Sequence, residues 1–439
     1  MLIPTSSGHT SLANNANILY ECIVERHHFF LNRKYYLQLT NQCLTLSQKQ
    51  DQQNPKYIYQ LKIDKVFTWS LQNNQIVGFQ LPYQDKIKDF FGNPNDMVNL
   101  KSKMGALVCY QKIELFYKKE EILQTGSFGK VTKEICRFTS NRVAIKSIKC
   151  QNNQSPAIKN EIEILKRLKQ TNTLNILEIK EVYKDEHNYY IVTEYLPGSN
   201  LKQHLERRNK PFLMQEALCI VESLLKGLQG IHQNGIIHRD LKPANLMYHN
   251  NQIKIIDFGL SCFNGKQLEQ YPSCGTAGYS APEVLNVWNK KQAYDYKVDI
   301  FSVGCILYQL LTLDGLFNSE NEKATYRNNK KCQFTIKEKG SVFDLVQLFV
   351  KAEPQQRLDC SQAMEAVQAL HDYKYFDVNT WYNNKVKYNQ KGRSQCELNQ
   401  EPQTKLSRQC SLTNFKYNEP QTQTQTERQR NQPKKIEQN

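Results

Sequence analysis

The amino-acid sequence predicts an α+β protein with a β-rich N-terminal part, a central part in which strands precede helices, and a polar C-terminal tail. Apolar and aromatic residues alternate with polar ones at a period of two from about residue 19 to 81. From about residue 116 to 376, β-type segments come first and long segments with apolar residues at helical spacing follow. These two periodicities are typical of strands and of amphipathic helices, respectively.

Composition limits the classes of protein to be considered. A chain of 439 residues can hold two domains and a tail. The 13 cysteines are odd in number and never spaced C-x-x-C, which argues against a disulfide framework or a zinc site and favours a reduced intracellular setting. The net charge of +16 is spread along the chain, so we expect no nucleic-acid partner. Without a signal peptide or a long apolar run, we expect a cytoplasmic protein that reaches membranes only peripherally.

Residues 18–112 are predicted to form a small antiparallel β-barrel capped by a C-terminal helix, after a leader at residues 1–17. Short segments such as ILYECIVE, KYYLQLT and VFTWSLQ have alternating apolar residues and are joined by Asn- and Gln-rich turns, which indicates antiparallel strands. A helix is expected within residues 93–110. Pro94 stands at its start, Asp96 lies near its positive end, and apolar residues follow at helical spacing.

This arrangement resembles a pleckstrin-homology domain, with NRKYYLQL (residues 32–39) at the position of the family's basic motif in strand two. If Arg33 and Lys34 faced the open end of the barrel together with Arg26, they could pair with inositol phosphates. The alternative is that these are solvated charges on a domain that contacts a regulatory protein or the neighbouring domain. The resemblance leaves both a phosphoinositide membrane surface and a protein partner open.

Six motifs occur in order along the central part: VAIK (143–146), NEIEIL (160–165), HRDLKPAN (238–245), DFG (257–259), GTAGYSAPE (275–283) and DIFSVG (299–304). Their chance assembly in this order is negligible. With them, residues 117–376 resemble a eukaryotic protein kinase, most of all the calcium/calmodulin-dependent and cyclic-AMP-dependent groups. The resemblance implies a bilobal fold with a β-rich N-lobe, an α-helical C-lobe and ATP in the cleft between them.

Transfer of the ATP γ-phosphoryl group needs positioned cations, metal-binding oxygens and one carboxylate. The resemblance assigns Lys146 to the α- and β-phosphates and pairs it with Glu161 on a helix. It makes Asp240 the catalytic base that accepts the proton of the substrate hydroxyl. Lys242 would steady the γ-phosphate, and together with Thr276 it marks a kinase of serine and threonine in protein substrates.

Two oxygen-bearing residues complete the set. The resemblance assigns Asn245 and Asp257 to Mg²⁺, a hard cation that prefers carboxylate, amide and phosphate oxygens. Each residue taken alone has a simpler interpretation, since a DFG sequence is often only a turn. Here it follows the apolar strand QIKII at the distance from the catalytic loop that the family shows.

The segment ILQTGSFGKVTKE (122–134) resembles the glycine-rich loop of kinases, although Gln124 stands where the family has its first glycine. Taken alone, a Gly-x-x-Gly turn is more simply a hairpin. If the Gln124 side chain points to solvent, its backbone still serves, so we expect a changed ATP affinity or slower loop closure and not an inactive site. The resemblance assigns ATP binding to Leu123, Gln124, Thr125, Gly126, Ser127, Phe128, Gly129, Lys130, Val131, Ala144, Lys146, Thr193, Glu194, Leu196 and Met247.

Two further departures from the family concern substrate and activation. The acidic residues that read arginines in substrates align with Asn200, Ala244 and Gln309, so no Arg-directed preference is expected. Pro272 stands where many relatives have a phosphorylated threonine. Either Ser273 or Tyr271 substitutes for it, or the segment needs no modification.

Residues 377–439 are rich in Gln, Asn, Lys and Arg, and we expect them to be disordered because they offer little apolar surface to bury. The whole sequence therefore predicts an ATP- and Mg²⁺-dependent serine/threonine protein kinase. The alternative is a pseudokinase scaffold that binds ATP or partners without phosphoryl transfer. Retention of the lysine, the base and the metal-binding residues favours the enzyme.

Overall fold

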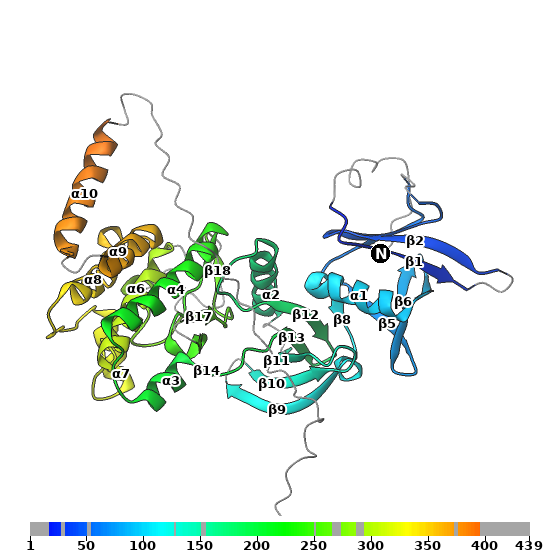
Figure 1. Cartoon of the computed structure of the whole chain (residues 1–439), viewed down its shortest axis with the longest axis horizontal. Coiled ribbons are helices and arrows are strands. Elements are labelled where there is room, and N and C mark those ends of the chain that lie inside the picture. The colour runs from blue at the N-terminus through cyan, green and yellow to red at the C-terminus, as the bar shows by residue number, and fades with distance from the viewer. Residues whose placement is uncertain are drawn as a thin grey trace, which may run out of the picture. The chain divides into compact units, whose positions relative to one another are not determined.

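The structure of the chain is a computed structural model that describes residues 17–27, 31–50, 54–126, 129–150, 155–249, 252–265, 274–286, 294–372 and 376–395. A β-rich N-terminal module (residues 18–112) precedes a strand lobe (residues 117–194) and a helical lobe (residues 199–372), as Figure 1 shows. Within these ranges, no helix combines the length and apolar character needed to cross a membrane.

The N-terminal module is built on seven antiparallel strands and one helix. The strand order is β4-β3-β2-β1-β7-β6-β5. In β2, alternate residues Tyr35, Leu37 and Leu39 are fully buried, as the period-two pattern predicts. The strands are β1 Tyr20–Arg26, β2 Arg33–Leu39, β3 Cys43–Ser47, β4 Tyr57–Gln60, β5 Val66–Gln72, β6 Gln75–Tyr83 and β7 Lys86–Gly92.

The sheet of the module is open, where we predicted a closed barrel. Strands β4 and β5 lie at opposite ends of the strand order, and the described residues show no pairing between them. The outer edge of β5 pairs instead with β8 (Cys109–Tyr110), in parallel, through Val66 with Cys109 and Phe67 with Tyr110. Because β8 occupies that edge, β5 does not close onto β4.

The predicted helix is present but shorter than expected. It is α1, Pro94–Met104, and the Asn93 side chain caps it by accepting a hydrogen bond from the Asn95 N–H at 2.9 Å. It ends at Gly105, whose φ of 45° no longer continues the helix. A 3₁₀ turn, η1 (Gly105–Leu107), then leads into β8.

The strand lobe continues the same sheet. Its strands follow β8 in the order β12-β13-β11-β10-β9, and the helix α2 carries Ile158, Ile162, Leu165 and Leu168 buried on one face. The elements are η2 Ile113–Leu115, β9 Tyr117–Gly126, β10 Gly129–Cys136, β11 Arg142–Lys149, α2 Ser155–Gln170, β12 Ile179–Lys184 and β13 Asn188–Glu194.

The helical lobe surrounds α6 (Lys297–Thr312). This helix is not amphipathic, because every residue from Val298 to Tyr308 is buried. The other helices are α3 Leu201–Arg208, α4 Met214–Gln233, η3 Pro243–Asn245, α5 Pro282–Leu285, α7 Glu322–Lys330, α8 Ser341–Phe349, η4 Pro354–Gln356 and α9 Cys360–Asp372. The lobe also contains the short strands β14 Ser199–Asn200, β15 Ile236–Ile237, β16 Leu246–His249, β17 Gln252–Ile255 and β18 Cys262–Phe263. These strands form the small sheets β14-β16-β17 and β15-β18.

The start of the C-terminal tail is helical, so the prediction of disorder from residue 377 is wrong there. Helix α10 spans Val378–Gln395. Val378 is fully buried, Trp381 and Tyr382 pack against the core of the helical lobe, and the Tyr382 hydroxyl donates to the Gln356 carbonyl at 2.6 Å. These three side chains dock the first turns of α10 on the helical lobe, although the segment is polar on average. Residues 396–439 lie outside the described residues.

A buried ion pair joins α5, which contains Glu283, to the segment between η4 and α9, which contains Arg357. Arg357 is fully buried and binds Glu283 through two nitrogens, at 2.7 and 3.2 Å. It also donates to the carbonyls of Lys297 and Lys351 at 2.8 Å each. This pairing fixes α5, at the end of the GTAGYSAPE motif, against the helical lobe.

We expect Arg357→Met to destabilise the protein by about 3 to 5 kcal/mol, because it leaves the Glu283 carboxylate buried without its partner. Chemical denaturation of the full chain measures this. Lys226→Ala, which removes a surface pair with Glu222, is the control and should change stability by less than about 1 kcal/mol. Equal effects of both variants would contradict the structural role of the buried pair.

Candidate active site

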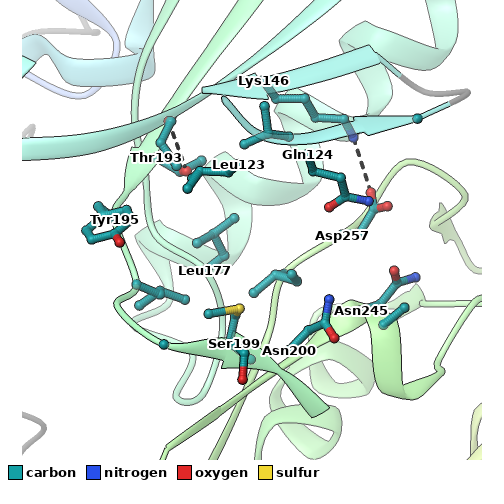
Figure 2. Close-up of a pocket in the computed structure, with 18 of the residues that line it drawn as sticks. Leu123, Gln124, Lys146, Leu177, Thr193, Tyr195, Ser199, Asn200, Asn245 and Asp257 are labelled. Carbon is teal, nitrogen blue, oxygen red and sulfur yellow. Dashed lines mark hydrogen bonds and ion pairs between the residues drawn. The ribbon is translucent and has the colours of Figure 1, made fainter. Parts of the chain in front are cut away.

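A cavity of about 740 Å³ separates the strand lobe from the helical lobe (Figure 2). Most of the predicted ATP-binding residues line it: Leu123, Gln124, Gly126, Gly129, Val131, Ala144, Lys146, Thr193, Glu194, Leu196 and Met247. Glu161, Lys242, Asn245 and Asp257 line it as well. Thr125 and Lys130 pair with each other across β9 and β10 and are not among the lining residues, whereas Ser127 and Phe128 lie outside the described residues.

Gly126, at the end of β9, and Gly129, at the start of β10, line the cavity. Gly126 and Gly129 are cross-strand partners. Gly129 has a φ of 124°, and a Cβ atom there would lie 2.3 Å from the Ser147 carbonyl oxygen, so glycine is required. A Cβ atom at Gly126 would meet nothing within 4 Å, which leaves room for a ligand beside its backbone.

Lys146 lies between two carboxylates from different parts of the fold. Its ammonium, on β11, is 2.7 Å from Glu161 Oε1 on α2 and 3.2 Å from Asp257 Oδ1, which follows β17. Burial disfavours the charged form of Lys146, but the two carboxylates outweigh it and raise the pKa of the ammonium. The pKa of Asp257 is lowered in spite of burial, chiefly by Lys146. The cluster therefore holds a permanent cation at the cavity wall.

The catalytic-loop residues form a second hydrogen-bonded group. The buried Asp240 carboxylate accepts from Thr276 Oγ1 at 2.7 Å and from Asn245 Nδ2 at 3.0 Å, and it pairs with Lys242 at 2.8 Å. Lys242 also donates to Thr276 at 2.6 Å. Four residues that the sequence analysis singled out separately are thus brought together around one carboxylate, with Lys242 and Asn245 reaching the cavity.

The donor set fits a magnesium ion. Asn245 uses its amide nitrogen for Asp240, which leaves the amide oxygen as the atom available to a cation. Asp257 contributes a carboxylate that lines the same cavity (Figure 2). Two protein oxygens leave the remaining positions of an octahedral ion to phosphate and water, which is the usual way proteins hold Mg²⁺.

Asp299 on α6 holds the backbone of the catalytic loop. The fully buried carboxylate accepts from the N–H groups of His238 and Arg239 at 2.9 Å each and from His232 at 2.8 Å. Burial opposes its charge, but the hydrogen bond and charge of His232 lower the pKa of Asp299. Arg239 adopts a left-handed φ of 70°, a strained conformation for a side-chain residue, and these bonds over-determine it.

Four buried residues lie behind the site: Leu165, Ile179, His238 and Phe258. The His238 and Phe258 rings lie 5.2 Å apart, edge to face. Burial lowers the pKa of His238, which keeps its imidazole neutral near pH 7. The Arg239 side chain meanwhile donates to the Leu260 carbonyl and, at 2.7 Å, to the Tyr294 hydroxyl.

The segment that links the lobes leaves its backbone beside the cavity. Thr193 Oγ1 donates to the Ala144 carbonyl at 3.3 Å (Figure 2), and the Glu194 carboxylate accepts from Lys254 at 2.6 and 2.8 Å. The Glu194 side chain is thus engaged with the helical lobe, and its backbone N–H donates to the Glu178 carbonyl at 3.0 Å.

Several lining residues were missed from the sequence: Leu177, Ile191, Tyr195, Ser199, Lys202, Gln203, Glu206 and Ile256. Ile256 directly precedes the DFG motif and could have been found from that spacing. The residues of β14 and α3 could not be found in this way, because no sequence motif marks them and only the fold brings them to the cavity.

The side chain of Gln124 points toward the cavity and not toward bulk solvent (Figure 2). Figure 2 shows its side chain extending from β9 into the cavity, on the side of Asp257. The solvent-facing side chain considered as a condition from the sequence is therefore not observed, although Gln124 remains exposed at the rim of the cavity. The pairing of β9 with β10 is irregular at this point: Val131 pairs with Gln124 and Thr132 with Ile122, so Leu123 is the extra residue of a β-bulge. The bulge interrupts the alternation of the strand, and both Leu123 and Gln124 line the cavity.

Comparison with known proteins agrees with this geometry. The model of the protein kinase domain matches residues 117–368, more than half of the chain. A probable serine/threonine-protein kinase 2 of Plasmodium falciparum is 30% identical over 293 residues, which cover 64% of this chain and 54% of the relative. A calcium/calmodulin-dependent protein kinase type 1 of Macrobrachium nipponense is 30% identical over 265 residues (57% of this chain, 74% of the relative). Calcium-dependent protein kinase 4 of Plasmodium berghei is 34% identical over 239 residues (52% and 44%).

The chain therefore belongs to the protein kinase family, as the six motifs indicated. It spans about half the length of the first and third of these relatives. The matched segment ends within α9 and begins at β9, so it leaves out the N-terminal module.

We expect Gln124→Gly to lower the Michaelis constant for ATP by about 3- to 10-fold, because it removes an amide side chain from the space that phosphates need. That change corresponds to about 1 kcal/mol. Steady-state kinetics at varied ATP concentration measures it. Lys118→Gly, on the same strand but outside the cavity lining, controls for added backbone freedom. A Michaelis constant and turnover number unaltered in Gln124→Gly would refute this role.

Proposed function

We propose that this protein is a serine/threonine protein kinase that uses ATP and Mg²⁺. The observation that carries the proposal is the placement, around one cavity, of the Lys146–Glu161–Asp257 cluster and the hydrogen-bonded group around Asp240. A permanent cation, two oxygen donors and a carboxylate base are the groups that phosphoryl transfer requires. Family membership and the names of the relatives support the same activity.

Each residue has a defined task in the proposed reaction. The hydroxyl oxygen of a substrate serine or threonine attacks the γ-phosphorus of ATP, the bond from that phosphorus to the β-phosphate oxygen breaks, and ADP leaves. Asp240 orients the hydroxyl and accepts its proton. Lys146 holds the α- and β-phosphates, and Lys242 balances charge on the transferred group. Mg²⁺, held by Asn245 and Asp257, supplies charge neutralisation between the phosphates when bound.

Thr276 has a bridging position in this proposal. Its hydroxyl donates to Asp240 and accepts from Lys242, so it ties the base to the γ-phosphate lysine. The positions that would read arginine in a substrate carry no acid: Asn200 and Ala244 line the cavity, and Gln309 accepts from the Tyr279 hydroxyl at 2.5 Å. The proposed substrates are therefore proteins without a required upstream arginine.

We expect Asp240→Asn to lower the turnover number by at least about 100-fold, since a positioned general base contributes factors of about 10² to 10⁴. Transfer of labelled phosphate from ATP to a generic acceptor protein measures this. Asp314→Asn changes an exposed carboxylate and should leave activity unaltered. Full activity in Asp240→Asn would overturn the enzyme assignment, and ATP binding without transfer in the parent would favour the pseudokinase scaffold.

We further propose that residues 18–112 form a pleckstrin-homology-like module. Support comes from seven antiparallel strands followed by one helix, with β1 pairing both β2 and β7. Arg26 and Arg33 are direct cross-strand partners, and therefore lie on one face. Lys34 is the next residue along β2 and lies on the other face, 3.8 Å from Glu25. The three cations chosen from the sequence are thus not all brought together.

The face that carries Arg26 offers other cations. Arg26 donates to the Tyr57 hydroxyl at 3.1 Å, and the Lys56 ammonium lies 5.7 Å from the centre of the same ring. Lys88 lies near Arg26 and Lys86: slight burial and repulsion by these two cations lower the pKa of Lys88. Like charges gathered in one place favour an anionic ligand, which relieves their repulsion. An inositol phosphate headgroup fits this chemistry, and binding it would recruit the kinase to the membrane periphery from the cytoplasm.

We expect the double substitution Lys86→Ala/Lys88→Ala to weaken binding of the full chain to phosphoinositide vesicles by about tenfold or more, at roughly 1 kcal/mol per lysine near an anionic surface. Sedimentation with vesicles measures this. Lys34→Ala is the matched control and should bind nearly as the parent does. If the parent fails to bind such vesicles, the module serves contacts with a regulatory protein instead.

A further inference from the structure

The N-terminal module is joined to the strand lobe by a shared sheet. Strand β8 pairs with β5 of the module on one edge and with β12 of the strand lobe on the other, both in parallel. Strand β12 would otherwise be the edge of the lobe's sheet, open to pairing with other chains. The apolar core is continuous across this junction, since Phe67 and Tyr110 belong to the same buried cluster as Tyr183 and Val192.

A buried ion pair crosses the same junction. Lys101 on α1 binds Glu181 on β12, and both side chains are about nine-tenths buried. The other Glu181 oxygen accepts from the hydroxyls of Tyr117 at 2.8 Å and Tyr183 at 2.7 Å. The Lys101 ammonium is also surrounded by aromatic rings, with centroids 4.7 to 5.9 Å away, of Phe116, Tyr110, Tyr183 and Tyr117. Removing the cation alone would leave a buried carboxylate without its charge partner.

A close backbone contact adds a second constraint on β12. Gly105 ends α1 with a positive φ, and a Cβ atom there would lie 2.9 Å from the Lys180 carbonyl oxygen. The turn after α1 therefore rests directly on the backbone next to Glu181. Both contacts come from the module, and both act on one short stretch of the strand lobe.

From β12 the constraint reaches the helix that bears Glu161. At the C-terminal end of α2, Lys169 donates to the Ile179 carbonyl at 2.8 Å and pairs with Glu178 at 2.9 Å. Ile179 begins β12 and is fully buried, as is nearly all of Leu165 on α2. The position of β12 thus sets the position of α2, and α2 sets the distance from Glu161 to Lys146.

We infer that the N-terminal module is an intramolecular brace of the kinase domain, in which Lys101 and Glu181 are positioning residues that keep α2 where Glu161 can pair with Lys146. The inference rests on the proposed phosphoryl transfer and names what regulates that site. A module that only recruited the kinase would need neither a buried ion pair nor a shared sheet. The brace makes the active geometry dependent on residues 18–112.

The test compares Lys101→Met with the parent in the full chain. Hydrogen exchange of the amides of Ser155–Gln170 reports on α2 and needs no activity, so it stays informative even if phosphoryl transfer is absent. We expect exchange of α2 to become faster and the turnover number to fall by about 10- to 100-fold, the range that a misplacement of about 1 Å can produce. The second substitution Glu181→Gln, which removes the orphaned charge and still accepts from the tyrosines, should restore both toward the parent values.

Two control variants separate a brace from a general loss of stability. Val24→Ala opens a cavity in the core of the module and leaves Lys101 and Glu181 in place, so it should lower the melting temperature without loosening α2. Lys103→Met changes an exposed lysine on the same helix and should alter neither quantity. If Lys101→Met does not fold, Lys101→Gln takes its place under the same criteria. Exchange of α2 and turnover equal to the parent, or loosening of α2 by Val24→Ala to the same degree, would overturn the brace.

Discussion

The placement of one partly buried ammonium, that of Lys146, ties together the strand lobe, helix α2 and the segment after β17. A cation in this position is tolerable only because carboxylates from the two other elements reach it at 2.7 and 3.2 Å. Each of those elements must therefore be held accurately by its own surroundings. The fold holds these carboxylates at one cavity, together with Lys242 and Asn245, which bind the Asp240 carboxylate.

The helical lobe delivers its share through buried polar groups. Asp299 lies on α6, a helix that is buried on nearly all sides, and its carboxylate oxygens accept hydrogen bonds from the backbone of the catalytic loop. The ion pair between Arg357 and Glu283 holds α5 in place in a similar way. Such groups are costly to bury singly and stable only as complete sets, which makes the loops they hold well defined.

The strand lobe delivers Glu161 in a less usual way, because its sheet does not end at β12. The module adds β8, β5 and the strands beyond them, and it buries Lys101 against Glu181 at the seam. The module therefore has two faces with different chemistry. One face contacts the kinase domain through the shared sheet and the Lys101–Glu181 ion pair. The other face carries the cations Arg26, Lys86 and Lys88 near the aromatic ring of Tyr57.

The sequence by itself determined the kinase family, the identity of the groups at the site and the alternation of the N-terminal strands, because these depend on local periodicity and on motifs whose chemistry requires particular side chains. It also indicated that α1 begins near Pro94. Only the tertiary structure decided that Gln124 points inward, that Lys34 faces away from Arg26, that the N-terminal sheet is open and that a helix begins at Val378. Each of these depends on which distant segment occupies an edge or a face, as when β8 takes the edge of β5, and no local pattern records that choice. The partnership of Lys101 with Glu181, 80 residues apart in the chain, belongs to the same class, since a lone lysine on a helix is otherwise expected in solvent.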